Sequence, residues 1–369
     1  MNDETLYSIA LSSITGIGPC RAKEFVREFG SASAVYRCSP YELAEHELSK
    51  NAMRLFLDHR NESLATAEKE MKEMERLGIS CYLFFDDNYP YRLRLCEDSP
   101  LVLFTNNVVD LNKEHYLSVV GTRNATDYGR VQTRSLIKQL AEICPNVTIV
   151  SGLAYGTDIN AQQAALEYGL RTVSVVAHGL HTIYPSYHRS TAEMLTMQGG
   201  AVLSEYPTTT NATPKNFLQR NRIVAGMSDA VVVMESSVQG GSLSTANHAL
   251  GYHRDVFAYP GRVGDAASEG CNALIKNQKA MLVTSADDII AAMNWTRCEA
   301  TATVVSSDDA FTTDELSVLT VLRQATEPMH FSVLLSQIGL PVHKLKSLLT
   351  KLEFQGVICQ LAGEKFQVL

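Results

Sequence analysis

Between residues 116 and 293 the chain alternates short apolar runs with amphipathic segments. This alternation predicts β–α–β units and therefore a parallel sheet, so the fold class is expected to be α/β. The helices between the strands are expected to start near residues 127, 157, 187, 217, 242 and 286. The strands are expected at residues 116–120, 148–150, 172–176, 201–204, 230–234, 256–258 and 281–283.

Other patterns flank this central region. Residues 1–64 show short helical periodicities, and residues 65–77 add an amphipathic helix that precedes two strand-like runs at 81–85 and 101–104. The aperiodic stretch after residue 295 is rich in Ser, Thr, Ala and Asp, which indicates a linker. Three helical segments and a hairpin follow and predict a winged helix. The expected division is an N-terminal helical module at 1–64, a central domain at 65–295, a linker at 296–310 and a winged helix at 311–369.

Both flanking modules contain a feature that could contact DNA. The turn around Gly16 and Gly18 joins two helices and resembles a helix-hairpin-helix, whose exposed amides can hold a phosphate, although a plain interhelical turn fits equally well. The third helix of the winged-helix module is expected to bury Leu345, Leu348, Leu349 and Leu352 and to expose Lys344, Lys346 and Lys351. That basic face suits DNA reading, a protein-docking surface or a merely solvated helix.

Charge and composition limit how this protein could bind a polyanion. The formal net charge is −8, so any phosphate binding must be local, in a cationic groove on an acidic body. No apolar run of about 18 residues is present, so no membrane contact is expected. The acidic N-terminus differs from a secretory signal and predicts a cytoplasmic protein. The eight cysteines are scattered singly without zinc-site spacing, and we expect no metal site.

Glycine-rich turns follow three of the expected strands. Because the carboxyl ends of parallel strands meet at one sheet edge, these turns should form a single anion-binding edge. The dinucleotide fingerprint G-x-G-x-x-G is absent, which disfavours a nicotinamide or flavin cofactor, and no cofactor is expected. Asp158, in the first turn of a helix, is interpreted as a cap in preference to an acid catalyst. The candidate phosphate-binding residues are Gly121, Thr122, Ser151, Gly152, Gly240, Gly241, Ser242 and Thr245.

A cationic segment between the second and third turns points to a polymeric ligand. Residues 214–222 combine three cations, three amides and one aromatic ring. Cations can meet successive phosphates, and a base stacked on Phe217 would add about 1–3 kcal/mol, although Phe217 could instead be a core residue. Arg123, after the first strand, offers a planar fork for a phosphate. This composition favours single-stranded nucleic acid.

Signatures of catalysis are weak, and no catalytic residue is assigned. The sequence contains neither a P-loop nor a G-x-S-x-G motif, and the loop pair His178 and His181 lacks the context of a zinc hydrolase. An enzyme acting on nucleotides, such as a phosphoribohydrolase, stays as the alternative, with Glu205 or Glu235 as its acid. A third hypothesis makes the winged helix the DNA reader and the central domain a nucleotide sensor.

The ordered motifs of the central region resemble the DNA-processing protein A family, DprA/Smf. They cover about half the chain, and the outer modules resemble the family's domains more loosely. Two departures are Gln162, where the family commonly has His, and Ala177-His178-Gly179-Leu180, which replaces a more usual Gly-x-Gly-Leu. The motifs are Gly121-Thr122-Arg123, Ser151-Gly152-Leu153-Ala154, residues 199–207, Asn216-Phe217, residues 220–226, residues 241–246, Pro260-Gly261 and Gly270-Cys271-Asn272.

The resemblance implies an extended Rossmann-like domain that forms a homodimer, preceded by a helix-hairpin-helix or SAM-like module and followed by a winged helix. It further implies a non-catalytic protein that binds and protects single-stranded DNA and loads the RecA recombinase, typically during natural transformation. Carried over by motif, the strand-contacting residues would be Arg123, Lys215, Phe217, Arg220 and Asn221.

Overall fold

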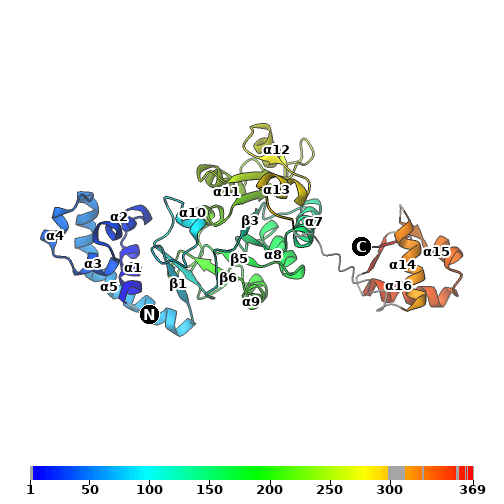
Figure 1. Ribbon diagram of the computed structural model, residues 1–369, viewed down its shortest axis with the longest axis horizontal. Helices are drawn as coiled ribbons and strands as arrows, with labels where there is room; N and C mark the ends of the chain where they lie inside the picture. The colour runs from blue at the N-terminus through cyan, green and yellow to red at the C-terminus, as the bar shows by residue number, and fades with distance from the viewer. Residues whose placement is uncertain are drawn as a thin grey trace. The chain divides into compact units, whose positions relative to one another are not determined.

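The chain forms two compact units, 1–298 and 299–369, which are considered separately. The computed structural model describes residues 3–297, 312–325, 328–354, 357–361, 363 and 365–368 (Figure 1). The predicted linker at 296–310 lies outside these residues except for its first two positions. Within the described ranges, no helix has the length and apolar character needed to cross a membrane.

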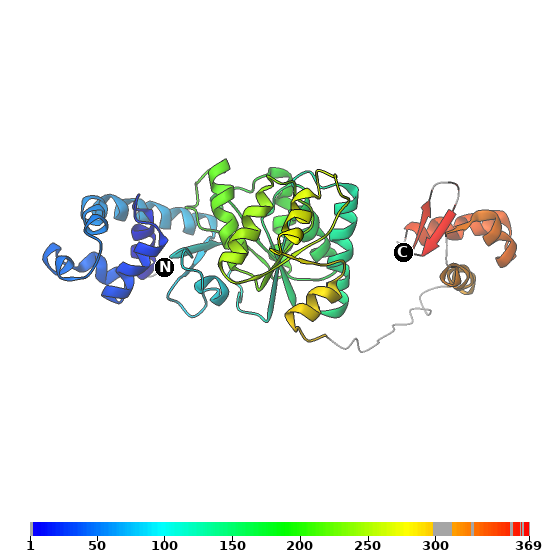
Figure 2. The same cartoon turned by 90° about the horizontal axis from the view of Figure 1, so that it is seen from above.

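A nine-stranded sheet organises the first unit (Figure 2). Its strand order is β1-β2-β6-β5-β4-β3-β7-β8-β9, and the seven strands from β3 to β9 are mutually parallel, which confirms the α/β fold class. The two strands before the central region, β1 and β2, add to one edge in antiparallel pairs. The strands are β1 Ser80–Leu83, β2 Val102–Thr105, β3 His115–Val120, β4 Val147–Ser151, β5 Thr172–Val175, β6 Ala201–Ser204, β7 Ala230–Val233, β8 Asp255–Ala258 and β9 Met281–Leu282.

Helices cover both faces of the sheet because its strands bury alternate residues on opposite sides. In β7, Val231 and Val233 pack in the core beneath α10 and α11, whereas Val232 packs in the core beneath α7, α8 and α13. A smaller cluster around Val202 joins α9 to the second face. The helices of this region are α6 Tyr91–Arg94, α7 Asp127–Ile143, α8 Thr157–Glu167, η1 Ser186–His188, α9 Arg189–Met197, α10 Pro214–Gly226, α11 Gly241–Gly251, α12 Glu269–Lys276 and α13 Ala286–Met293.

The strand order reverses between β3 and β7. From β3 the chain proceeds through β4, β5 and β6 on one side, and it then returns to place β7, β8 and β9 on the other. Open α/β sheets bind ligands outside the carboxyl ends of the strands at such a reversal. The topology therefore positions a crevice between the loops that follow β3 and β7.

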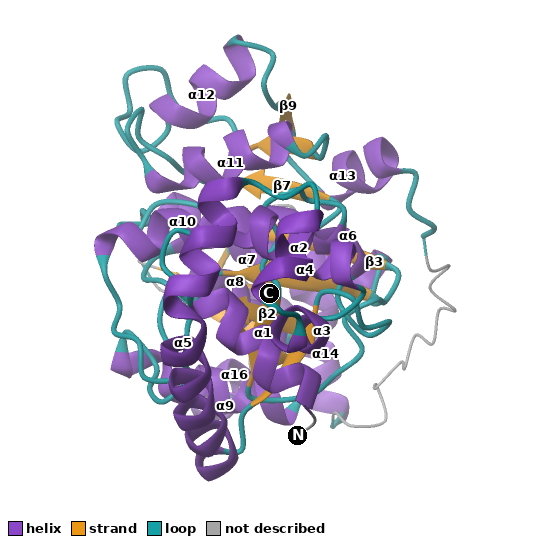
Figure 3. Ribbon diagram, turned by 90° about the vertical axis from the view of Figure 1, so that its left-hand side faces the viewer, coloured by secondary structure: helices purple, strands orange, loops and turns teal. Residues whose placement is uncertain are grey.

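Five helices precede the sheet: α1 Asp3–Ser13, α2 Pro19–Phe29, α3 Ala32–Arg37, α4 Pro40–Glu45 and α5 Lys50–Leu77. Figure 3 shows α5 as one unbroken helix. It therefore passes through residue 64, so the proposed module boundary at that residue falls inside a helix. The turn between α1 and α2 contains Gly16 at φ +90°, a conformation that glycine adopts readily. A protein contact or a phosphate contact would both suit this turn.

Lys23 of α2 attaches the helical module to the loop before β2. Its Nζ donates to the Glu97 carbonyl at 2.6 Å and to Ser99 Oγ at 2.9 Å. The side chain is 2 % exposed, and burial lowers the pKa of Lys23 from 10.5 to about 8. The lysine therefore serves as a buried hydrogen-bond donor between two parts of the first unit.

This depressed pKa predicts a pH-dependent stability. Between pH 8 and 10.5 the unfolded chain binds a proton at Lys23 that the folded chain has released, so the contribution of Lys23 to stability rises with pH across that window. We expect the urea midpoint of the protein to rise relative to that of Lys23→Met between those pH values. A difference between the two proteins that does not change with pH would contradict the assignment.

The second unit has the elements of a winged helix around its own apolar core. Of the lysines predicted to be exposed on α16, Lys344 pairs with Asp314 and Lys351 with Glu315, the latter at 2.7 Å. The basic face is thus partly neutralised by α14. The elements are α14 Thr313–Gln324, β10 Met329–His330, α15 Phe331–Ile338, α16 Val342–Phe354, β11 Ile358–Leu361 and β12 Lys365–Val368, with sheet order β10-β12-β11.

Candidate nucleic-acid interface

A pocket of about 710 Å³, here called the edge pocket, lies where the loops after β3, β4, β5 and β7 meet α10. It occupies the crevice that the strand reversal between β3 and β7 predicts. All of the sequence-predicted site residues line it except Lys215 and Ser151. Those that do are Gly121, Thr122, Arg123, Gly152, Phe217, Arg220, Asn221, Gly240, Gly241, Ser242 and Thr245.

The two exceptions have clear positions. Lys215 is an exposed residue in the first turn of α10, beside the pocket wall formed by Pro214 and Phe217. Ser151 is fully buried, and its Oγ donates to the Val119 carbonyl at 2.7 Å, which ties β4 to β3. Neither residue lines the edge pocket, so their assignments as ligand-binding residues stay predictions.

Two helix N-termini contribute backbone dipoles at this edge. Helices α8 and α11 start after Gly156 and Gly240, and neither has a side-chain cap. In α8 the amides of Thr157 and Ile159 already donate to the carbonyls of Thr122 and Ala154, so of the two helices it is α11, whose first residues line the edge pocket, that offers an open anion site. A Cβ added to Gly241 would meet no atom within 4 Å, so the start of α11 is sterically open. Uncapped amides and the positive end of a helix dipole favour an anion at such a position.

Gly156 explains how the turns after β3 and β4 approach each other. Its φ is +76°, and a Cβ there would lie 2.2 Å from the Thr122 carbonyl oxygen. The Thr157 amide donates to that same carbonyl at 3.1 Å. Any larger residue at position 156 would separate the two turns, so the glycine in this motif has a packing role that precedes any contact with a ligand.

Arg123, Phe217 and Arg220 form the cationic and aromatic part of the edge pocket. The Arg123 guanidinium carbon lies 4.7 Å from the Phe217 ring centroid, and that of Arg220 lies 6.0 Å from it. Tyr184 approaches the same ring with centroids 6.0 Å apart. Phe217 is thus a half-buried pocket residue and not a core residue, and Arg123 stays exposed to solvent. Arg123, Phe217 and Arg220 could together contact a phosphate and a base of a bound strand.

Arg220 lies beneath that surface and is 4 % exposed. Its Nη1 donates to the Gly152 carbonyl at 2.8 Å and also to the Val175 carbonyl, so one side chain ties α10 to the ends of β4 and β5. A Cβ on Gly152 would lie 2.5 Å from the guanidinium nitrogens, so only glycine leaves room for it. The Arg220 guanidinium therefore places a positive charge at the floor of the edge pocket.

Asp158 is a buried carboxylate whose charge interacts with the positive charge of Arg220. Its Oδ2 accepts from the Gly152 amide at 3.1 Å, so it holds the loop before α8. Burial raises the pKa of the Asp158 carboxyl, and the charge of Arg220 opposes that rise. The N-cap of α8 is Gly156 and the helix has no side-chain cap, so the interpretation of Asp158 as a cap is wrong, and its carboxylate instead holds the preceding loop.

The pocket also contains residues that were not assigned to the site from sequence. His178, Tyr184 and Asn211 belong to its lining. The Nε2 atom of His178 accepts from the Tyr184 amide at 3.1 Å, while Nδ1 donates to the Gly179 carbonyl at 2.8 Å. From the sequence, His178 belongs to a weak metal-binding pair and to a loop that departs from the family motif, and it has no assigned role at this edge. Its position directly after a strand was the signal that could have placed it at this edge.

The two acids named for the enzymatic alternative lie outside the lining of the edge pocket. Glu235 is 1 % exposed, and its carboxylate accepts from the amide and the hydroxyl of Thr126 at 2.9 and 2.5 Å. Glu205 forms an ion pair with Arg222, and burial raises the pKa of its carboxyl while Arg222 opposes the rise. Both acids support neighbouring loops and helices. Among the described residues no group of three or more His, Cys, Asp or Glu side chains could hold a metal.

Fold and pocket together define a Rossmann-like protein with a glycine-lined crevice, bordered by arginines, at its strand reversal. The model of the DNA recombination-mediator protein A family matches residues 80–294, and the model of the DprA winged helix domain matches residues 299–364. The chain therefore belongs to the DprA family, and both the expected family and the expected winged helix are confirmed.

Relatives cover different parts of the chain. Protein Smf of Escherichia coli K12 is 41 % identical over 202 residues, which are 55 % of this chain but only about half, 53 %, of that relative. The X-ray structure of DNA processing protein A from Streptococcus pneumoniae matches with 31 % identity and a TM-score of 0.65 over 79 % of this chain and 98 % of its own. The Helicobacter pylori protein, studied for its single-stranded DNA binding mode, matches with 29 % identity and a TM-score of 0.52 over 58 % of this chain and 95 % of its own.

Proposed function

We propose that this protein is a non-catalytic single-stranded DNA binding protein. In this proposal it protects incoming DNA in the cytoplasm and loads a RecA recombinase on it during DNA uptake and recombination. The strand lies in the edge pocket against Arg123, Phe217, Arg220 and Asn221, with Lys215 at the rim. The glycine turns hold its phosphates, and the active form is a homodimer through the central domain.

One observation carries the proposal: the exposed Arg123, the Phe217 ring and the buried Arg220 guanidinium meet the uncapped N-terminus of α11 in a single pocket. Helix N-termini alone would suit any small anion. The added aromatic ring beside exposed Arg123 suits a polymer whose phosphates and bases alternate. A family relative from Helicobacter pylori binds single-stranded DNA, which supports this choice of polymer.

The proposal is tested by comparing single-stranded oligothymidine with a duplex of equal length in gel-shift and fluorescence-anisotropy titrations. We expect the single strand to bind more tightly. We also expect the logarithm of its binding constant to fall linearly with the logarithm of salt concentration, by about 0.7 per phosphate contact. Equal binding of both forms, or binding that does not respond to salt, would contradict the proposal.

The same samples test the enzymatic alternative. Incubation with nucleoside monophosphates should release no base, with wild-type protein and with Glu235→Gln alike, because neither Glu205 nor Glu235 lines the edge pocket. Recombinase loading is tested separately, by the rate at which RecA forms filaments on DNA coated with a single-strand binding protein. Sedimentation of the free protein tests the dimer.

Removal of the winged helix should leave oligonucleotide binding almost unchanged. Two of the three α16 lysines already pair with Asp314 and Glu315, and the edge pocket is built wholly from the first unit. For a chain ending at residue 310 we expect the dissociation constant for oligothymidine to stay within about threefold of the intact value, a difference below about 0.7 kcal/mol. A loss of tenfold or more would favour the winged helix as the DNA reader.

A further inference from the structure

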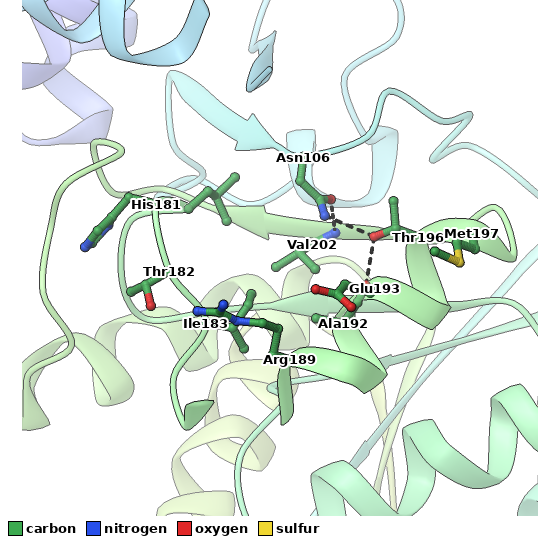
Figure 4. Close-up of a pocket in the computed structure, with 11 residues that line it drawn as sticks. Asn106, His181, Thr182, Ile183, Arg189, Ala192, Glu193, Thr196, Met197 and Val202 are labelled. Carbon is green, nitrogen blue, oxygen red and sulfur yellow. Dashed lines mark hydrogen bonds between the residues drawn. The ribbon is translucent and has the colours of Figure 1, made fainter. Parts of the chain in front are cut away.

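A second hollow, here called the α9 groove, lies next to the edge pocket. It has a volume of about 410 Å³ and is formed by the loop after β5, one face of α9, Val202 of the interior strand β6 and Asn106 after β2. Figure 4 shows His181, Thr182 and Ile183 toward one end and Thr196 and Met197 toward the other. Thr182 lines both the groove and the edge pocket, so one short loop separates the two hollows.

The floor of the groove is apolar. Ala192 is 3 % exposed and Val202 is fully buried, and the partly buried Ile183 packs beside them. Asn106 at one side is already engaged, because its Oδ1 accepts from the Val202 amide at 2.8 Å and its Nδ2 donates to Thr196 Oγ1 at 3.0 Å. A flat apolar body could therefore lie on this floor without leaving buried polar groups unpaired.

Two charges border that floor. Arg189 and Glu193 stand one helical turn apart on α9, and both are exposed (Figure 4). Within the described ranges, neither side chain has an oppositely charged partner within 4.0 Å. Of the other exposed arginines of the first unit, Arg76 and Arg134 form such pairs, whereas Arg54 and Arg123 resemble Arg189 in having none within the described ranges. An unpaired cation and an unpaired carboxylate thus flank an apolar floor beside the edge pocket.

We propose that the α9 groove receives a nucleobase of the single strand held in the edge pocket. This inference rests on the proposed function, and it deepens it by adding a subsite with a base preference. Arg189 pairs with the phosphate that crosses the Thr182 loop. The base lies against Leu180 and Ile183, the partly buried apolar residues of the lining, and the Glu193 carboxylate accepts a hydrogen bond from its exocyclic amine.

The carboxylate decides which bases fit. Cytosine presents an exocyclic amine that can donate to Glu193, whereas thymine presents a carbonyl oxygen in the corresponding position, which the carboxylate repels. Thr182 connects the α9 groove to the edge pocket, and Arg189 is an unpaired cation at the groove. Both observations favour a nucleotide over an apolar peptide segment as the occupant of the groove. A peptide would gain nothing from the connection to the edge pocket.

The test uses the intact protein and fluorescence anisotropy. The probes are an oligothymidine of about six nucleotides, in the range that single-strand sites cover, and the same oligomer extended to about twelve with cytidines or thymidines at either end. We expect Arg189→Glu to weaken the extended oligomers about tenfold and the short one by less than twofold, about 1.4 against 0.4 kcal/mol. Arg54→Glu, the same charge reversal on exposed α5, should change neither class.

Glu193→Leu tests the base preference. Wild-type protein should bind the cytidine extension about fivefold more tightly than the thymidine extension, and the leucine variant should bind them equally, a loss of about 1 kcal/mol of discrimination. If Arg189→Glu affects long and short oligomers alike, or if the wild type shows no cytidine preference, the groove inference is wrong and the edge-pocket proposal stands. If the short oligomer fails to bind wild-type protein, the proposed function itself is wrong.

Discussion

Replacing Arg123 by alanine should weaken binding of oligothymidine by about 10- to 150-fold, which corresponds to about 1.5–3 kcal/mol for a hydrogen bond to a charged group. Arg123 is exposed and lies over the Phe217 ring at 4.7 Å, so its loss removes a phosphate partner without opening the core. The salt slope should fall by about 0.7, the value for one phosphate on a single strand. Titrations at several salt concentrations measure both effects.

Two variants make this prediction specific. Arg123→Lys keeps the charge but loses the planar fork and the stacking on Phe217, so its affinity should be intermediate while its salt slope stays that of the wild type. Arg130→Ala removes an exposed arginine of α7 that pairs with Asp127 at 3.3 Å, and it should leave binding unchanged. Equal losses in Arg123→Ala and Arg130→Ala would mean that net charge alone governs binding.

The fold could be predicted where local pattern and tertiary structure agree. The buried parallel strand β7 is a continuous apolar run, and helices such as α7 carry a clear helical period. Pairing partners have no such local signal. The antiparallel placement of β2 beside β6 depends on contacts about a hundred residues apart. Helix α12 was not predicted, because only Ser268 and Glu269 mark its start after the largely exposed loop at 261–267.

The candidate site shows the same division. Glycine turns after strands could be predicted to converge, because parallel strands place their carboxyl ends at one edge. How deeply each side chain would be buried could not be predicted from the sequence. The segment from Lys215 to Arg220 spans less than two helical turns, so its cations point in different directions. Lys215 is therefore exposed at the rim, and Arg220 is buried beneath the pocket and bonded to backbone carbonyls.

Replacing Arg220 by methionine should lower the free energy of unfolding of the first unit by about 2–5 kcal/mol. Methionine can fill much of the space, but it leaves the Gly152 and Val175 carbonyls without their donor. It also leaves the Asp158 carboxylate buried without the nearby positive charge that opposes the rise of its pKa. Urea denaturation followed by circular dichroism measures the loss, and DNA affinity should fall in the same variant because the pocket floor loses its charge.

The pH dependence of that loss separates the electrostatic part from packing. Without Arg220 the pKa of Asp158 rises further in the folded state while it keeps its ordinary value of 3.8 in the unfolded chain. The folded state then binds more protons above pH 3.8, so the stability of Arg220→Met falls as pH rises toward neutrality, and its deficit relative to wild type shrinks in acid. Adding Asp158→Asn removes the titrating group, and the double variant should recover stability at pH 7 and lose the pH dependence of the deficit. A deficit that is constant with pH and unaffected by Asp158→Asn would assign Arg220 to packing and backbone hydrogen bonds alone.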